Sequence, residues 1–294
     1  MTVLITLTVA GADSGPFNLY SDIDGYTTAF ESGVSQAALL AGYSSSLVPD
    51  YTTIVRVLST GVCNNYIDIT LTSGTTTTTT TSLFSCNTLG SASSFSVLAS
   101  TDITNTNPTN IIGDVGLFPG TSFIGFPPGT ITGNTNIDDL TARNAQTDAD
   151  NAFTCLSALS STGSVGADIG GTTITPGIYT VSSSLAITGT VTLDGLGDAN
   201  SVFIFQIPST FIPASSAYVD LINSAQAGNI YWLVGSSATL STGSTTFGNI
   251  IASTSITIDS GAKLTGRAIA LTGAITMDFN IIENTTCTIN PCLT

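Results

Sequence analysis

The chain has 294 residues, of which 42% are hydrophobic and only 8% are charged, with 4 Lys plus Arg against 19 Asp plus Glu. The formal net charge of −15 leaves no basic footprint for a nucleic acid or an anionic membrane surface, and no apolar stretch reaches the ~18 residues of a transmembrane helix. The absence of histidine excludes Ser-His-Asp triads and most zinc sites, so we expect no metal and no cofactor.

Residues 1–73 are predicted to form a small β-rich domain with one short helix. The apolar first ten residues have no Lys or Arg before them and alternate like a strand, so we recognise no secretory signal there. Alternation predicts strands at 3–9, two within 17–30, 52–60 and 65–71, and a helix over 32–43 with Ser32 as its cap and an end near Gly42.

This domain resembles the N-terminal modules of structural proteins encoded by aquatic phages and bacteria, in the stretches 5–26, 45–57 and 63–71. The resemblance implies a mount for assembly and self-association through this module. It implies no biochemical activity.

A threonine-rich linker is predicted at residues 74–88. Its tract of seven threonines favours an exposed, extended segment that could carry O-linked sugar. The candidate positions are Thr75, Thr76, Thr77, Thr78, Thr79, Thr80 and Thr81. A separate N-glycosylation sequon begins at Asn284, just before a tail predicted at 285–294.

Residues 89–284 contain short segments in which apolar residues alternate with Thr and Ser, each closed by Gly, Ser, Thr or Asp. The pattern is clearest over 185–277. Alternation places Ile, Val, Leu, Phe and Ala on one side of each strand and mostly Thr and Ser on the other. Turn residues that recur at short intervals without an exact repeat length predict stacked coils of an irregular β-solenoid.

One long amphipathic helix is predicted within this region, at 138–160, where the chain has no Gly or Pro. Asp138 or Asp139 would lie in its acidic first turn. Such a helix spans ~30 Å and could brace about six coils stacked ~4.8 Å apart. Its apolar stripe comprises Ala142, Ala145, Ala149, Ala152, Phe153, Leu156 and Leu159.

The five cysteines are interpreted as a partial disulfide framework, since a low-charge, Thr-rich chain suits an oxidising exterior. Sequence-local pairing suggests Cys63 with Cys86 and Cys287 with Cys292, which would leave Cys155 free. Four paired cysteines allow three connectivities, and five reduced thiols remain the alternative.

Residues 89–133, 166–211 and 229–278 resemble, in the right order, the bacterial and fungal ice-binding proteins. The resemblance implies a mainly β fold: a right-handed irregular β-solenoid of triangular section, closed out of sequence order, with one long α-helix packed alongside, here preceded by the small β-rich N-terminal domain. It also implies binding of ice, or of another ordered surface, through one flat face without enzyme activity.

Some members of this family use Thr-(Ala/Gly)-x-(Thr/Asn) steps on the ice face, and we identify such steps at residues 132–135 and 242–245. Outward Thr and Ser also alternate further along. Each Thr offers a hydroxyl and a methyl to ordered water, although Thr is also simply favoured on exposed strands. The candidate surface residues are Thr132, Thr135, Thr242, Thr245, Ser253, Ser255, Thr257, Thr272 and Thr276.

Other chemistry has weaker support. The pairs Asp22/Asp24 and Asp138/Asp139 lack the spacing of a calcium loop. β-Solenoids also host polysaccharide-cleaving enzymes, but the aspartates at predicted turns suit local hydrogen bonds better: Asp194, Asp198, Asp259 and Asp278. Tyr231 and Trp232 alternate in one strand, so one is expected in the core and the other exposed.

Three functions from different classes follow. The first is a solenoid that binds ice or another ordered surface. The second is a structural subunit of an extracellular filament or virion, with the solenoid as displayed decoration. The third is a carbohydrate-active tail protein. We favour a combination of the first two, presented outside the cell or on a virion surface.

Overall fold

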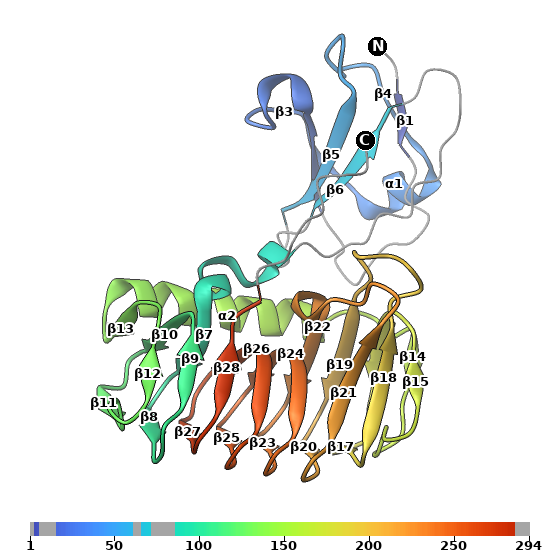
Figure 1. Cartoon of the computed structure of the whole chain (residues 1–294). Helices are drawn as coiled ribbons and strands as arrows, with labels where there is room; N and C mark the ends of the chain where they lie inside the picture. Colours follow the sequence, from blue (N-terminus) through green and yellow to red (C-terminus); the bar gives the residue numbers. More distant parts are fainter. Residues whose placement is uncertain (1–2, 6–15, 61–65, 72–85, 286–294) are drawn as a thin grey trace. The chain divides into compact units, whose positions relative to one another are not determined.

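A computed structural model describes residues 3–5, 16–60, 66–71 and 86–285. The chain divides into two compact units (Figure 1): unit 1 comprises residues 1–85 with 158–160, and unit 2 comprises 86–157 with 161–294. Among the described residues, no helix is both long and apolar enough to span a membrane. The threonine tract and nearly all of the predicted tail lie outside the described ranges.

Unit 1 is a small β-rich unit, as its alternating pattern predicts. A four-stranded antiparallel sheet has the order β3-β2-β5-β6, and β1 pairs with β4 in a separate two-stranded sheet. The strands are β1 (Val3–Ile5), β2 (Phe17–Ser21), β3 (Ala29–Val34), β4 (Tyr43–Ser45), β5 (Ile54–Ser59) and β6 (Tyr66–Thr70), with the 3₁₀ turn η1 (Asp22–Asp24) after β2.

The helix of unit 1 is shorter than predicted. It is α1 (Gln36–Ala41), and its cap is Ser35, whose Oγ accepts a hydrogen bond from Ala38 N at 3.2 Å. The prediction of Ser32 as the cap is wrong because β3 continues through that position to Val34. Gly42 follows the helix, as expected.

Unit 2 is a stack of three-sided coils whose strands pair in parallel (Figure 1). We call the side formed by the seven-stranded sheet the ladder face. Its strands, in spatial order, are β11 (Ser122–Ile124), β8 (Asp102–Asn105), β27 (Ile275–Met277), β25 (Ile256–Ile258), β23 (Ala238–Leu240), β20 (Phe211–Pro213) and β17 (Leu185–Ile187).

The other two sides join where the long strands β24 (Thr245–Ala252) and β26 (Lys263–Ala270) turn a corner. The corner needs glycine, because a Cβ at Gly266 would lie 1.9 Å from the Gly248 carbonyl oxygen. The helix-covered face contains β13 (Thr135–Ile137), β10 (Asp114–Leu117), β7 (Phe95–Ala99), the ends of β26 and β24, β22 (Ile230–Val234), β19 (Phe203–Ile207), β16 (Gly177–Thr180) and β14 (Gly163–Ser164).

The third face contains the starts of β26 and β24 together with six further strands. These are β12 (Thr130–Ile131), β9 (Asn110–Ile112), β28 (Ile281–Glu283), β21 (Tyr218–Ile222), β18 (Thr190–Asp194) and β15 (Thr173–Ile174). The 3₁₀ segments η2 (Cys86–Ser94) and η3 (Ala227–Asn229) precede β7 and β22.

Spatial order in the stack differs from chain order. β7, β8 and β9, at the start of unit 2, pair with β26, β27 and β28, which come last in the chain. β10, β11 and β12 continue the stack beyond them. The strand pairing therefore confirms the expectation that the coils stack in an order that differs from the sequence, with the last coil placed against the first.

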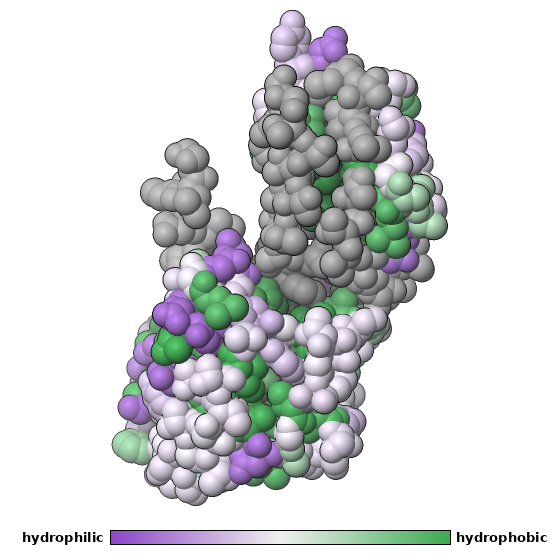
Figure 2. Space-filling view, turned by 90° about the vertical axis from the view of Figure 1, so that its right-hand side faces the viewer, coloured by the Kyte–Doolittle hydropathy of each residue, from purple (hydrophilic) through white to green (hydrophobic). Residues whose placement is uncertain are grey.

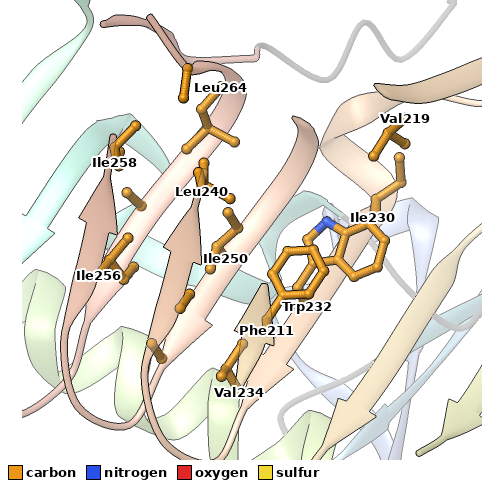
Figure 3. Close-up of a cluster of buried hydrophobic side chains, with 14 of the residues drawn as sticks. Phe211, Val219, Ile230, Trp232, Val234, Leu240, Ile250, Ile256, Ile258 and Leu264 are labelled. Atoms are coloured by element: carbon orange, nitrogen blue, oxygen red, sulfur yellow. The ribbon is translucent and has the colours of Figure 1, made fainter. Parts of the chain in front are cut away.

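The core lies inside the coils and is almost entirely apolar (Figure 3). Trp232 is fully buried and stacks on the rings of Phe205 and Phe211, at centroid distances of 4.3 and 4.6 Å. Tyr231 is buried as well. The expectation that one of this pair is exposed is wrong, because the outer side of this face is covered by a helix that packs on β22.

That helix is α2 (Leu140–Ser157), somewhat shorter than the predicted 138–160. It begins after Asp139, whose carboxylate accepts hydrogen bonds from Ala142 N and Asn136 Nδ2, both at 2.8 Å. It reaches from β13 to β19, where Gln206 Nε2 donates to the Leu156 carbonyl. The buried positions are Ala142, Ala145, Ala149, Ala152, Cys155, Leu156 and, just beyond the helix, Leu159, whereas Phe153 is only partly buried.

We expect this cap to make the unfolding transition sensitive to acid. The hydrogen bonds from Ala142 and Asn136 lower the pKa of Asp139 below its ordinary 3.8. Because the folded-state pKa is the lower one, the stabilisation is complete above the unfolded pKa and is lost as the pH falls through the folded value. Thermal unfolding at pH 2–7 measures this. Asp139→Asn keeps a capping side chain without the titrating charge, so its midpoint should fall less below about pH 4.

One buried arginine closes the solenoid at the corner where the chain enters and leaves it. Arg267 donates to the Ser93 carbonyl at 2.6 Å, to Asn249 Oδ1 at 2.7 Å and to the Thr285 carbonyl at 3.0 Å. Burial lowers the pKa of Arg267 to about 10, so the guanidinium stays protonated at neutral pH. Asn284 Nδ2 also donates to the Ser93 carbonyl, at 3.1 Å.

Substitution Arg267→Lys should therefore lower the free energy of unfolding by about 1–3 kcal/mol, because an ammonium cannot reach all three acceptors and leaves at least one unsatisfied. Denaturant unfolding measures the change. Arg143→Lys is the matched control, since Arg143 is exposed on α2. Equal effects of the two substitutions would contradict the assignment of Arg267 as the closing residue.

The structure also bears on two sequence predictions about covalent modification. Cys155 is disulfide-bonded, so the prediction that it is free is wrong. The side chains of Cys63, Cys86, Cys287 and Cys292 lie outside the described part of the chain. The Asn284 amide donates to the Ser93 and Ser94 carbonyls, so glycosylation of its nitrogen would have to break at least one of these bonds.

Candidate functional site

Four threonines line up across the ladder face. Thr239 is the register partner of Thr257, Thr257 of Thr276, and Thr276 of Thr104. They occupy four consecutive strands of one sheet, so successive side chains repeat at the strand spacing of ~4.8 Å. Thr276 is exposed and the other three are partly exposed. We call this row the threonine ladder.

The sequence places each ladder threonine outward by flanking it with apolar residues. Ile256 and Ile258 lie on either side of Thr257 in its strand, and Ile275 and Met277 flank Thr276; all four apolar side chains are buried. Alternation then forces the central residue to the surface. The row ends in apolar residues at both limits: Ile124 beyond Thr104, and Ile212 followed by Ala186 beyond Thr239.

The ladder hydroxyls make no hydrogen bond to the described part of the chain. Over the described residues, none of the four donates to or accepts from another group of the chain. Two of the other candidates are already engaged: Thr272 donates to the Ser253 carbonyl at 2.6 Å, and Ser255 Oγ accepts from Ala274 N at 3.3 Å. The ladder therefore offers hydrogen-bonding capacity outward, whereas those hydroxyls stabilise turns.

The nine candidate residues from the sequence are only partly brought together. Ser255, Thr257 and Thr276 lie along the ladder face, and Ser253 and Thr272 lie in the turns that lead into it. The remaining four do not belong to this face. Thr242 lies in the turn that leaves it, Thr245 and Thr132 lie on or beside strands of the third face, and Thr135 begins β13 on the helix-covered face.

In each of the two Thr-Gly-x-Thr motifs, the two threonines therefore lie on opposite sides of a corner of the coil and do not share one flat face. Thr104 and Thr239 are the ladder members that the sequence analysis missed. A usable signal exists, because three ladder strands are triplets of one threonine between two apolar residues, Ala-Thr-Leu, Ile-Thr-Ile and Ile-Thr-Met. The fourth strand, Asp-Ile-Thr-Asn, keeps only the preceding isoleucine, so its register had to come from the fold.

The other faces are unsuited to a flat neutral surface. The helix-covered face is closed by α2. The third face carries the charged side chains of Asp220, Lys263 and Glu283 and a Tyr218–Phe247 pair in edge contact. Viewed toward the end with β14 and β15, the solenoid surface is mostly of intermediate hydropathy, in keeping with its 8% charged residues (Figure 2).

Of the four aspartates at predicted turns, Asp194 and Asp198 act as local hydrogen-bond acceptors, as the sequence predicts, whereas Asp278 accepts from a residue distant in sequence. Asp194 Oδ1 accepts from Leu196 N at 2.9 Å, Asp198 Oδ1 accepts from Asn200 N at 2.8 Å, and Asp278 accepts from an asparagine amide at 2.6 Å. Within the described ranges, no group of three or more His, Cys, Asp or Glu side chains is placed to hold a metal.

Comparison with known proteins identifies relatives of unit 2. A family profile described as Ice-binding-like matches residues 97–283. The ice-binding protein of Nostoc sp. (strain HG1) is 44% identical over 202 residues, which cover 68% of this chain and 75% of the relative. The ice-binding protein of Flavobacterium frigoris (strain PS1) is 32% identical over 209 residues, covering 66% of this chain and 75% of the relative.

Two solved structures share the fold. The crystal structure of the ice-binding protein from the Antarctic ascomycete Antarctomyces psychrotrophicus superposes with a TM-score of 0.66 at 42% identity, covering 67% of this chain and 98% of that chain. The crystal structure of an ice-binding protein from an Antarctic biological consortium gives a TM-score of 0.66 at 43% identity. The match covers 72% of this chain and 95% of that chain. The family profile begins at residue 97, so it does not cover unit 1.

Proposed function

The chain belongs to the ice-binding family, whose members are binding proteins and not enzymes, and we propose that it binds ice through the threonine ladder. The observation that carries this proposal is the row of four consecutive threonines whose hydroxyls make no bond within the described chain. Each supplies a donor, an acceptor and a methyl group to the surface.

The scaffold beneath the ladder supports this assignment. Threonine is branched at Cβ and has few rotamers, so ordering its side chain against a surface costs little entropy. The backbone of each ladder strand is bonded on both sides and rests on fully buried residues. Such a row can order its bound water molecules before the protein contacts the ice surface. Ice is uncharged, so the net charge of −15 does not oppose the contact.

The chain enters and leaves the described part of the solenoid at one corner. Ser93 and Thr285 meet at Arg267, at the corner between the helix-covered and third faces. In a three-sided coil, this corner lies opposite the ladder face. We propose that residues 1–73 mount the solenoid on a larger extracellular or virion-surface assembly through self-association.

The test is ice-crystal shaping and thermal hysteresis with the full-length chain, together with its partition into a growing ice front. We expect faceted crystals and enrichment in the ice. Absence of all three would overturn the proposed function and leave the solenoid as a structural element. Analytical ultracentrifugation separately tests the mount, since a chain that stays monomeric at high concentration would contradict self-association.

A further inference from the structure

The coil that completes the ladder is the last one to be synthesised. We call β26, β27 and β28 the C-terminal coil, and the strands β7 to β12 the first two coils. β27 pairs with β25 on one side and with β8 on the other. Asn280 N, just before β28, donates to Thr109 Oγ1, just before β9, at 3.1 Å across 171 residues of sequence.

The first two coils cannot be stable by themselves. Repeat architectures need about three or more stacked repeats, because one or two leave most of their apolar surface in water. The first two coils gain their next neighbour only from the C-terminal coil. Their buried inner residues Val97, Ile103 and Ile111 are the register partners of Ala268, Ile275 and Ile282, which are all buried too.

The pairing between β27 and β8 also divides the ladder between early and late parts of the chain. Thr104 is made early and Thr276 late, yet they are direct neighbours in the row. Before residue 263 has been added, Thr239 and Thr257 have no further ladder partner, and Thr104 lies in an unsupported pair of coils. The complete row of four therefore depends on the end of the solenoid sequence.

We propose that the C-terminal coil is a completion checkpoint: the ladder forms only after residues 263–283 have been synthesised, so that a nascent or truncated chain does not present the ice-binding face. The statement about binding rests on the proposed function. The statement about folding rests on the strand pairing alone, and the two are separable by experiment.

The position of Arg267 shows how the checkpoint can be removed while every described strand of the solenoid keeps its sequence. Because Ser93 and Thr285 meet at this residue, a short linker can join residue 285 to residue 89. The new chain is cut between residues 160 and 163, and residue 85 is joined to residue 163. Its order is then 1–85, 163–285, linker, 89–160. Coils then follow one another in spatial order, with α2 last, and each coil finds a neighbour as soon as it is made.

Two measurements test the checkpoint. The first is amide hydrogen exchange of a chain that ends at residue 262, alone and with the peptide 263–294 added. We expect β8 and β11 to exchange freely in the truncated chain and to regain protection with the peptide. Protection of β8 without the peptide would overturn the proposal.

The second measurement compares refolding of the natural and permuted chains from urea, followed by the fluorescence of the single tryptophan. Lower contact order should make the permuted chain refold about tenfold faster or more. Equal refolding rates of the two chains would contradict the checkpoint. If the permuted chain does not fold, hydrogen exchange of the truncated chain alone decides whether the checkpoint holds. If both folding results hold but the natural chain shapes no ice, the proposed function fails and the checkpoint stands.

Discussion

The double substitution Thr257→Tyr/Thr276→Tyr should abolish ice shaping and thermal hysteresis by weakening the affinity for ice at least ~tenfold, the effect of losing ~1.4 kcal/mol of binding free energy. The two positions are register partners at the centre of the ladder. A phenol ring there rises above the neighbouring threonines and holds a flat surface away from their hydroxyls. Because both side chains point out of the coil between buried neighbours, the thermal unfolding midpoint should change little.

The matched control is Thr190→Tyr/Thr245→Tyr on the third face. Thr190 is exposed and Thr245 is partly exposed, so the pair repeats the exposure of Thr276 and Thr257 on a different side of the same solenoid. We expect this control to keep full activity. Loss of activity in the control, with activity kept in the ladder variant, would move the ice-binding face to the third face.

Substitution Trp232→Ala should lower the free energy of unfolding of unit 2 by about 3–5 kcal/mol, the range for removing a large aromatic side chain from a core. The Trp232 ring stacks nearly parallel on the rings of Phe205 and Phe211, and its Nε1 donates to the Phe247 carbonyl at 2.9 Å. Figure 3 shows Trp232 against Phe211 in the core. The variant loses these contacts, creates a cavity behind β20 and leaves the Phe247 carbonyl without this donor. Urea unfolding followed by circular dichroism measures the loss.

Trp232→Phe separates packing from hydrogen bonding. It retains an aromatic ring against Phe205 and Phe211 but removes the indole donor, so we expect a smaller loss, with the unpaired Phe247 carbonyl contributing about 1–3 kcal/mol. Tyr218→Phe is a surface control, since Tyr218 is 42% exposed. A cost for Trp232→Ala no larger than that of the surface control would show that the stack does not support the solenoid.

Local pattern was enough to predict most of the secondary structure of this chain. The run Ile256-Thr257-Ile258 reads as a strand with its threonine outward whatever surrounds it, because alternation in a strand is a property of the backbone. The alanines of α2 likewise predict one buried stripe, because residues three and four apart share a helix face. The helix starts differ by a few residues because strands or caps occupy the preceding positions, as at Ser35 and Asp139.

Composition and pattern together determined a low-charge chain without histidine, built from short alternating strands and one long Ala-rich helix. Only the tertiary structure decided which of its many threonines lie in one row. Thr104 and Thr276 became neighbours through a pairing that spans most of unit 2, Tyr231 became buried through the docking of α2, and Thr242 and Thr245 were separated by a corner. Strand register between distant segments depends on which coils stack, and no local pattern in the chain specifies that.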